Sequence, residues 1–330
     1  MVNIGLIQMK SKQLEIHENL MKAEHYVSQV AKDGAELVVM PEMFNVGFVT
    51  SEELMKLAEP LDGLTVNWLK DQAAKNNVYI ITSIYEKFEG SFYNTMVMVG
   101  SDRSLQIYRK RNPTAQERLV WTRSDVPGPG IFETPFGRVG GAICFDSFSK
   151  ETYEGFKKSG VELVVIVALW GTVLPKKRYP DSIYINKLLK HQSYLASEVV
   201  PHKYATKLKV PAVYSNQSGI LNFPMNHPRF YPFPDWAKSQ YEFVGNSNIY
   251  NASGKTLVND VDSKGEFCSV TAVEMNSVKK KPEIARVNIP PNYLKKDYYF
   301  VEPPFMFRLY QNLCFKGFEK KHIELGRLNS

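Results

Sequence analysis

The chain has 330 residues, of which 44% are hydrophobic and 23% are charged, and its formal net charge is +7. This composition is typical of a globular protein with one large core. The sequence contains no run of about 18 apolar residues, and its lysines form short clusters without a nucleic-acid-binding motif, so we expect neither a membrane span nor a nucleic-acid partner.

Strand and helix patterns alternate along the chain, with several hairpins between them. The expected strands span residues 2–9, 37–40, 78–85, 92–99, 105–108, 131–134, 138–144, 161–169, 210–214, 243–250, 255–258 and 266–273. The expected helices span residues 14–32, 64–76, 150–158 and 181–198. A long loop over 109–130 and an aromatic, non-periodic insert over 221–241 interrupt this order. Such an order predicts mixed sheets with helices outside them.

Neither an internal repeat nor a low-complexity linker divides the chain, so we expect one domain over 1–275 and a C-terminal arm over 276–330. The arm is rich in aromatic residues and must pack against the body or a partner subunit. The cysteines are widely spaced, at Cys144, Cys268 and Cys314, and the first residues lack the pattern of a secretory signal. Both observations favour reduced thiols and a cytoplasmic location.

Cys144 ends an apolar run that has the pattern of a buried strand, and a helical pattern begins near Ser149. Free backbone N–H groups and the dipole at the start of a helix favour the thiolate form of such a cysteine. The alternative is a buried cysteine that acts as a small hydrophobic residue.

Three charged residues occupy positions where charge is costly or functional. Glu42 directly follows the apolar strand at 37–40, and a carboxylate there is expensive to bury unless it is paired or used. Lys110 and Glu117 lie in the loop over 109–130, which is long enough to be functional. The alternative for all three is ordinary solvated charge.

Four short segments together resemble a known family, the nitrilase superfamily of carbon–nitrogen hydrolases. These segments are Pro41-Glu42-Met43-Phe44, Tyr108-Arg109-Lys110, Ile143-Cys144-Phe145-Asp146 with Glu151, and Ala168-Leu169-Trp170. The resemblance extends over about residues 2–273 and rests on the order and spacing of the segments rather than on any one of them. It implies a four-layer α-β-β-α sandwich of two mixed sheets, assembled as a homodimer or a larger homo-oligomer.

The resemblance also implies roles for residues of this chain. Glu42 corresponds to the general base, Lys110 to the cation that stabilises the oxyanion and Cys144 to the nucleophile. The best match for a second glutamate after the lysine is Glu117. Two lesser candidates for that position are Glu133 and Asp125.

Two further residues are expected at the substrate. The backbone N–H of Phe145 would join Lys110 in stabilising the oxyanion. Trp170 either lines the pocket or packs in the core. Phe148 stands where many amidase-type members have an arginine, so a contact with a substrate carboxylate is not implied here.

The expected function is hydrolysis of a small amide or N-carbamoyl compound through a thioester, without a metal or another cofactor. Phe145-Asp146 resembles the amidase and carbamoylase branches, and the insert over 221–241 is expected to shape a pocket for an apolar group. Two alternatives stay open: a nitrilase that converts a nitrile to an acid and ammonia, and a catalytically silent scaffold.

Overall fold

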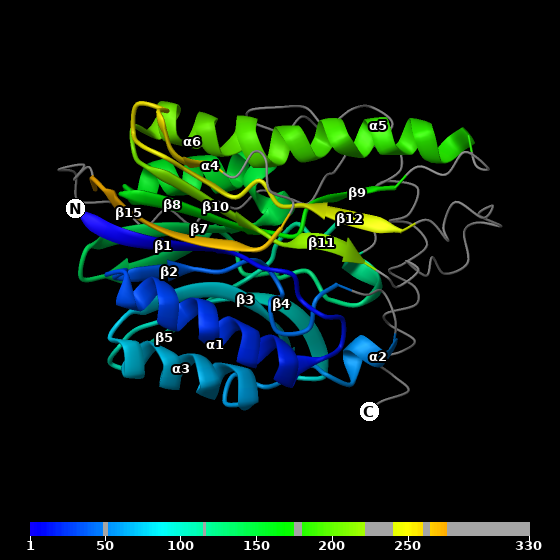
Figure 1. Ribbon diagram of the computed structural model, residues 1–330, viewed down its shortest axis with the longest axis horizontal. Helices are drawn as coiled ribbons and strands as arrows, with labels where there is room; N and C mark the ends of the chain where they lie inside the picture. Colours follow the sequence, from blue (N-terminus) through cyan, green and yellow to red (C-terminus); the bar gives the residue numbers. More distant parts are fainter. Residues whose placement is uncertain (49–51, 115–116, 175–179, 222–239, 260–264, 276–330) are drawn as a thin grey trace.

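Two six-stranded mixed sheets lie face to face, with helices on both outer surfaces (Figure 1). The computed structural model describes residues 1–48, 52–114, 117–174, 180–221, 240–259 and 265–275. The expected four-layer α-β-β-α sandwich is therefore confirmed.

The first sheet has the order β15-β1-β2-β3-β4-β5. Its strands are β15 (Phe267–Val273), β1 (Val2–Gln8), β2 (Leu37–Val39), β3 (Tyr79–Phe88), β4 (Ser91–Val99) and β5 (Leu105–Arg109). Strands β1, β2 and β3 are parallel, and the outer pairs are antiparallel. Because β2 is central and short, the chain leaves the sheet at residue 40 and delivers Glu42 to its edge.

The second sheet has the order β14-β13-β10-β8-β7-β6. Its strands are β14 (Thr256–Asn259), β13 (Asn248–Tyr250), β10 (Ala212–Asn216), β8 (Leu163–Ala168), β7 (Gly137–Ile143) and β6 (Gly130–Thr134). Strands β7, β8 and β10 are parallel, so their carboxyl ends lie along one edge. A third, smaller sheet has the order β11-β12-β9 and consists of β11 (Ser218–Leu221), β12 (Tyr241–Val244) and β9 (Gly171–Val173).

Helices cover the outer face of each large sheet. Helices α1 (Ile16–Lys32) and α3 (Leu64–Asn76) lie on the first sheet, whereas α4 (Lys150–Ser159), α5 (Pro180–Tyr194) and α6 (Val200–Leu208) lie on the other side (Figure 1). A one-turn helix, α2 (Glu52–Met55), connects β2 to α3. Amphipathic spacing explains the attachment of α1, because its buried apolar side chains recur every three or four residues.

The main apolar core lies between the two large sheets and includes Leu6, Val39, Ile81, Val165 and Val213. All five side chains are fully buried. These β-branched and leucine side chains pack well on pleated surfaces, so the sheets hold each other at a fixed spacing.

The strand expected over residues 243–250 is wrong, because the structure divides it. Residues Tyr241–Val244 form β12 of the small sheet and Asn248–Tyr250 form β13 of the second large sheet. Between them Gly245 and Asn246 have φ angles of 63° and 57°, which turn the chain out of one sheet and into the other.

The helix expected over residues 181–198 also differs from the structure. Helix α5 ends at Tyr194, a π-helical turn covers Leu195–Val199, and α6 continues to Leu208. Pro201 has no N–H to donate to the carbonyl oxygen of Ser197 four residues earlier. Asn248 Nδ2 donates to that oxygen instead, at 2.6 Å, so a side chain of β13 repairs the irregularity.

Two expectations fall outside the part of the chain that the structure describes. They are the pocket-shaping role of the insert, of which residues 222–239 are not described, and the packing of the arm over 276–330. Within the described ranges, no helix combines the length and the hydropathy needed to cross a bilayer.

The repair of the helix by Asn248 predicts a coupling between two distant positions. Asn248→Ala leaves the carbonyl of Ser197 unpaired in the interior, and we expect the free energy of unfolding to fall by about 1–3 kcal/mol. In a Pro201→Ala background an N–H becomes available, so the same substitution should cost about 1 kcal/mol less. Chemical denaturation of the four proteins measures this coupling.

Asn67→Ala is the control for that cycle, because Asn67 Nδ2 donates to the carbonyl of Asp62 at an exposed position. We expect it to change the free energy of unfolding by less than about 0.5 kcal/mol. If Asn248→Ala lowered the free energy of unfolding equally in the two backgrounds, Asn248 would not be compensating for the missing N–H of Pro201.

Candidate active site

Glu42 is fully buried and lies three residues beyond the end of β2 at Val39. Its Oε1 atom accepts hydrogen bonds from Asn94 Nδ2 at 2.6 Å and from Lys110 Nζ at 2.8 Å. Its backbone carbonyl accepts a hydrogen bond from Gln217 Nε2 at 2.8 Å. Oε2 accepts no hydrogen bond from any described residue, so this carboxylate keeps one oxygen available to a proton donor.

Lys110 directly follows β5, and its side chain is fully buried. Its Nζ atom lies 2.8 Å from Glu42 Oε1 and 2.7 Å from Glu117 Oε1. The other oxygen of Glu117 accepts a hydrogen bond from the backbone N–H of Thr114 at 2.6 Å. Two carboxylates therefore compensate the buried ammonium, which would otherwise be very costly to remove from water.

Cys144 lies at the end of β7 and begins a 3-10 turn, η2 (Cys144–Phe148). Its φ angle is +50°, a conformation that is uncommon for residues other than glycine and that clusters at functional sites. Ser147 Oγ donates to the carbonyl oxygen of Cys144 at 2.7 Å and closes the turn. The chain thus turns sharply out of β7 at the residue that carries the thiol.

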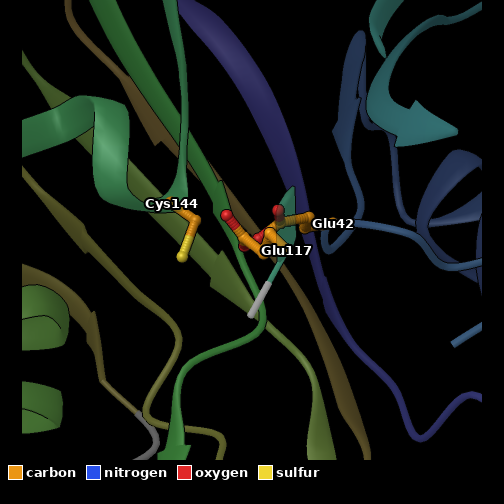
Figure 2. A group of neighbouring side chains, drawn as sticks. All are labelled: Glu42, Glu117 and Cys144. Atoms are coloured by element: carbon orange, nitrogen blue, oxygen red, sulfur yellow. The ribbon is translucent and has the colours of Figure 1, made fainter. Parts of the chain in front are cut away.

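The four side chains from Glu42, Lys110, Glu117 and Cys144 meet in one buried place. The Sγ atom of Cys144 and one oxygen of each glutamate all lie within 4.8 Å of one another. Figure 2 shows the two carboxylates close together beside the turn that carries the thiol. The structure thus brings together the four residues that the sequence analysis placed in the catalytic set.

Burial and charge set the protonation states of this group. Burial raises the pKa of Glu42 to about 7, although Lys110 opposes the rise. Burial also raises the pKa of the Cys144 thiol well above its usual value, with the carboxylate of Glu42 adding to the effect. Burial alone would lower the pKa of Lys110, but Glu117 and Glu42 together raise it above its ordinary value.

The expectation of a thiolate at the start of a helix is therefore wrong. Helix α4 begins only at Lys150, after the turn η2, and its N-cap is Ser149. The helix dipole acts mainly within the first turn, so it does not stabilise charge on Cys144. Burial dominates instead, and the resting form is a thiol that needs a base.

An aromatic group lies next to the thiol. The ring centroids of Phe145 and Phe148 are 5.6 Å apart, and that of Trp170 lies 6.4 Å from Phe145 and 5.9 Å from Phe148. All three side chains are buried, and Trp170 Nε1 has no hydrogen-bond partner among the described residues. Trp170 thus packs with the two rings that follow the thiol, while its indole N–H stays available.

The two lesser candidates for the second glutamate position lie elsewhere. Glu133 is exposed and pairs with Arg138 Nε at 2.6 Å on the β6–β7 hairpin. Asp125 is exposed in the loop before β6. Neither belongs to the buried group.

Sequence reasoning missed the amides that hold the site. Asn94, in the middle of β4, donates to Glu42 Oε1, and Gln217 donates to the backbone after β2. Asn216 accepts from the backbone N–H of Trp170 at 2.8 Å and donates to its carbonyl oxygen at 3.1 Å. The available signal was the presence of amides inside or directly after apolar strands, where polar groups need partners.

The cluster of Glu42, Glu117 and Cys144 has the donor atoms of a metal site, since three possible ligands lie within 4.8 Å. However, the ammonium of Lys110 already lies between the two carboxylates. A divalent cation there would be repelled by that charge and would need a deprotonated thiol, whereas the thiol pKa is raised. The residues present do not fit a metal.

Known proteins resemble this chain in sequence over about half of its length. The chain is 34% identical over 167 residues to a nitrilase of Pyrococcus abyssi, and 29% identical over 171 residues to an omega-amidase of Bos taurus. These matches cover 50% and 49% of this chain but only 63% and 61% of the two relatives, so the chain spans about three fifths of their length.

Solved structures share the fold at low sequence identity. A carbon–nitrogen hydrolase of Helicobacter pylori has a TM-score of 0.69 at 21% identity, covering 82% of this chain and 88% of that one. A carbon–nitrogen hydrolase superfamily protein of Xanthomonas campestris has a TM-score of 0.62 at 20% identity, covering 82% and 90%. The family model for carbon–nitrogen hydrolases matches residues 3–282, which is most of the chain. The chain therefore belongs to the carbon–nitrogen hydrolase family.

Proposed function

We propose that this protein hydrolyses the carbon–nitrogen bond of a small amide or N-carbamoyl compound through a thioester on Cys144. The observation that carries the proposal is the meeting of the Cys144 thiol, the Glu42 carboxylate and the Lys110 ammonium in one buried place. A nucleophile, a base and a cation within reach of one another are the groups that acyl transfer requires.

Acylation begins with proton transfer from the thiol to Glu42. Because the pKa of the thiol is raised, the sulfur becomes nucleophilic only as the carboxylate removes its proton. The S–C bond then forms, and the electron pair of the carbonyl bond moves to oxygen. Glu42 returns the proton to the nitrogen, the C–N bond breaks, and ammonia or an amine leaves.

The negative oxygen formed in this step needs positive partners. Lys110 supplies a fixed charge, and the backbone N–H of Phe145 supplies a second donor in the same role. One such donor typically lowers the barrier by about 3–4 kcal/mol. Glu117 acts on Lys110, because its carboxylate holds the ammonium at 2.7 Å.

Deacylation reverses the roles with water as the nucleophile. Glu42 accepts a proton from water, the new C–O bond forms, and the C–S bond breaks. The proton returns to the sulfur, and the acid leaves. A carboxyl group with a pKa of about 7 suits both halves, because it can hold and release a proton near neutral pH.

The aromatic residues beside the thiol favour an uncharged, apolar acyl group. Phe148 is buried against Phe145 and Trp170, so these positions offer no charge to a substrate carboxylate. Trp170 fits the substrate-binding role, since its unpaired indole N–H can donate to a polar atom of the substrate.

Nitrile hydrolysis is the second candidate, and the similarity to the nitrilase of Pyrococcus abyssi supports it. The same thiol would attack the nitrile carbon, with the proton passing through Glu42 to the nitrogen, to give a thioimidate. Addition of one water and loss of ammonia would convert it to the thioester, which a second water would hydrolyse as above. We further propose a cytoplasmic homodimer or larger homo-oligomer, with residues 1–275 as the catalytic domain and the arm over 276–330 packed on the body or a partner subunit.

The substrate class is tested by comparing amides, N-carbamoyl compounds and nitriles that share the same acyl or alkyl group. Incubation with short aliphatic and aromatic amides, their N-carbamoyl analogues and the corresponding nitriles should release ammonia fastest from uncharged amides or carbamoyl compounds. Faster acid formation from nitriles than from matched amides would favour the second candidate. Absence of turnover on the whole panel, with a folded protein, would favour a silent scaffold.

The nucleophile is tested by two cysteine substitutions. Cys144→Ser replaces the thiol with a poorer nucleophile, and we expect kcat to fall by at least about a thousandfold. Cys268→Ser is the control, because this thiol lies half-buried on the edge strand β15, away from the site, and should leave kcat within about twofold. Persistent turnover in Cys144→Ser would rule out the thioester.

The pH profile of kcat/KM reports Glu42. The base must be ionised to accept the proton, and its pKa is raised to about 7 by burial. Activity should therefore rise with pH up to about 7 and level off above about 8. Because the pKa of Lys110 is raised, we expect no loss of its charge below about pH 10. A rise centred near the ordinary glutamate value would contradict this assignment.

A further inference from the structure

Asp146 is a buried carboxylate to which neither the sequence nor the mechanism above gives a role. It lies in the turn η2, two residues after Cys144, and its side chain is fully buried. Its Oδ2 atom accepts a hydrogen bond from Tyr108 Oη at 2.9 Å. Its Oδ1 atom accepts two more, from the backbone N–H and from Nδ2 of Asn112, each at 2.8 Å.

The partners of Asp146 flank the catalytic lysine. Tyr108 precedes Lys110 by two residues, on β5, and Asn112 follows it by two residues, in the next loop. One carboxylate therefore joins both sides of Lys110 to the turn that carries Cys144. Strand β5 belongs to the first sheet and β7 to the second, so no backbone ladder sets this distance.

We propose that Asp146 is a positioning residue, whose carboxylate fixes the ammonium of Lys110 relative to the sulfur of Cys144. The inference rests on the proposed function for its effect on turnover, but the geometry that it describes can be tested on the thiol alone. Asp146 touches neither the thiol nor the other catalytic side chains through any hydrogen bond given above, so it acts through Tyr108 and Asn112.

The pattern of donors suits an ionised carboxyl group. All three hydrogen bonds are donated to Asp146, which a carboxylate can accept without a proton of its own. Burial raises the pKa of Asp146, whereas Lys110 and the donors from Asn112 and Tyr108 oppose the rise. Rigid hydrogen bonds of this kind hold an oxyanion donor in place better than packing alone.

A second buried carboxylate provides a matched control. Glu86, on β3, is fully buried and accepts hydrogen bonds from Arg109 Nε and Thr95 Oγ1. Arg109 is the neighbour of Lys110 in the sequence, but its guanidinium packs over the rings of Phe88 and Tyr93. The loss of the Glu86 carboxylate therefore removes another buried acceptor, with its ion pair to Arg109, without loosening the link to Cys144.

The experiment compares Asp146→Asn, Asp146→Ala and Glu86→Gln with the unmodified full chain. We expect Asp146→Ala to lower kcat by about 10²–10³, as for loss of one oxyanion donor, with KM changed less than about threefold. Asp146→Asn keeps an acceptor for Asn112 and should lose about tenfold. Glu86→Gln should lower the melting temperature but leave kcat within about threefold.

A second measurement does not depend on the substrate. The rate of Cys144 alkylation by iodoacetamide, followed against pH in a background with both Cys268→Ser and Cys314→Ser, reports the electrostatic effect of Lys110 on the sulfur. Displacement of the ammonium should move the midpoint of this profile to higher pH in Asp146→Ala. Glu86→Gln should leave the midpoint unchanged.

The outcomes separate the two ideas. If the unmodified protein turns over no amide or nitrile, the proposed function fails, and the alkylation profile still decides the role of Asp146. If a folded Asp146→Asn and Asp146→Ala match the unmodified protein in kcat and in the alkylation midpoint, the positioning role is overturned. Equal losses of kcat in Glu86→Gln would overturn it too. If Asp146→Ala does not fold, kcat and the alkylation midpoint of Asp146→Asn decide whether Asp146 has the positioning role.

Discussion

The ammonium of Lys110, enclosed with two carboxylates and cut off from water, is the interaction on which the rest of the site depends. One positive charge cannot fully compensate two negative charges in a medium of low polarity, so one carboxyl group must bind a proton readily. Glu42 is that group, with a pKa of about 7. Burial raises this pKa, and the negative charge of the neighbouring Glu117 adds to the rise, while the single ammonium of Lys110 opposes it.

The thiol completes this balance. Burial raises the pKa of Cys144, and the negative charges of Glu42 and Glu117 raise it further, because an ionised sulfur would add another negative charge beside them. The sulfur is therefore a protonated, weakly nucleophilic thiol until a substrate binds. Proton transfer to Glu42 and attack on the substrate can then occur together. Such coupling links the reactivity of the nucleophile to the protonation state of its base.

Strand and helix patterns predicted mixed sheets with helices outside them. The resemblance of four short segments to a known family implied the four-layer order and the grouping of Glu42, Lys110, Glu117 and Cys144, because the residues alone left solvated charge and an inert buried cysteine open. The hydrogen bonds that Tyr108 and Asn112 donate to Asp146 could not be predicted in the same way. These hydrogen bonds join residues 38 and 34 positions apart in the sequence. Tyr108 lies on the first sheet and Asp146 in the turn after β7 of the second, so their contact depends on how the sheets are stacked. Nor could apolar spacing reveal the π-helical turn or the hydrogen bond that Asn248, on another element, donates to the carbonyl of Ser197.

The hydrogen bonds between the Asn216 amide and the backbone of Trp170 determine whether this chain tolerates a modification made before it folds. Asn216-Gln217-Ser218 has the Asn-x-Ser spacing of an N-glycosylation acceptor. In the folded protein Asn216 is fully buried, and its Nδ2 donates to the carbonyls of Trp170 and Gly245 at 3.1 and 2.8 Å. A sugar on that nitrogen would remove these donors and have no room, so a chain glycosylated there during export could not assemble this end of β10.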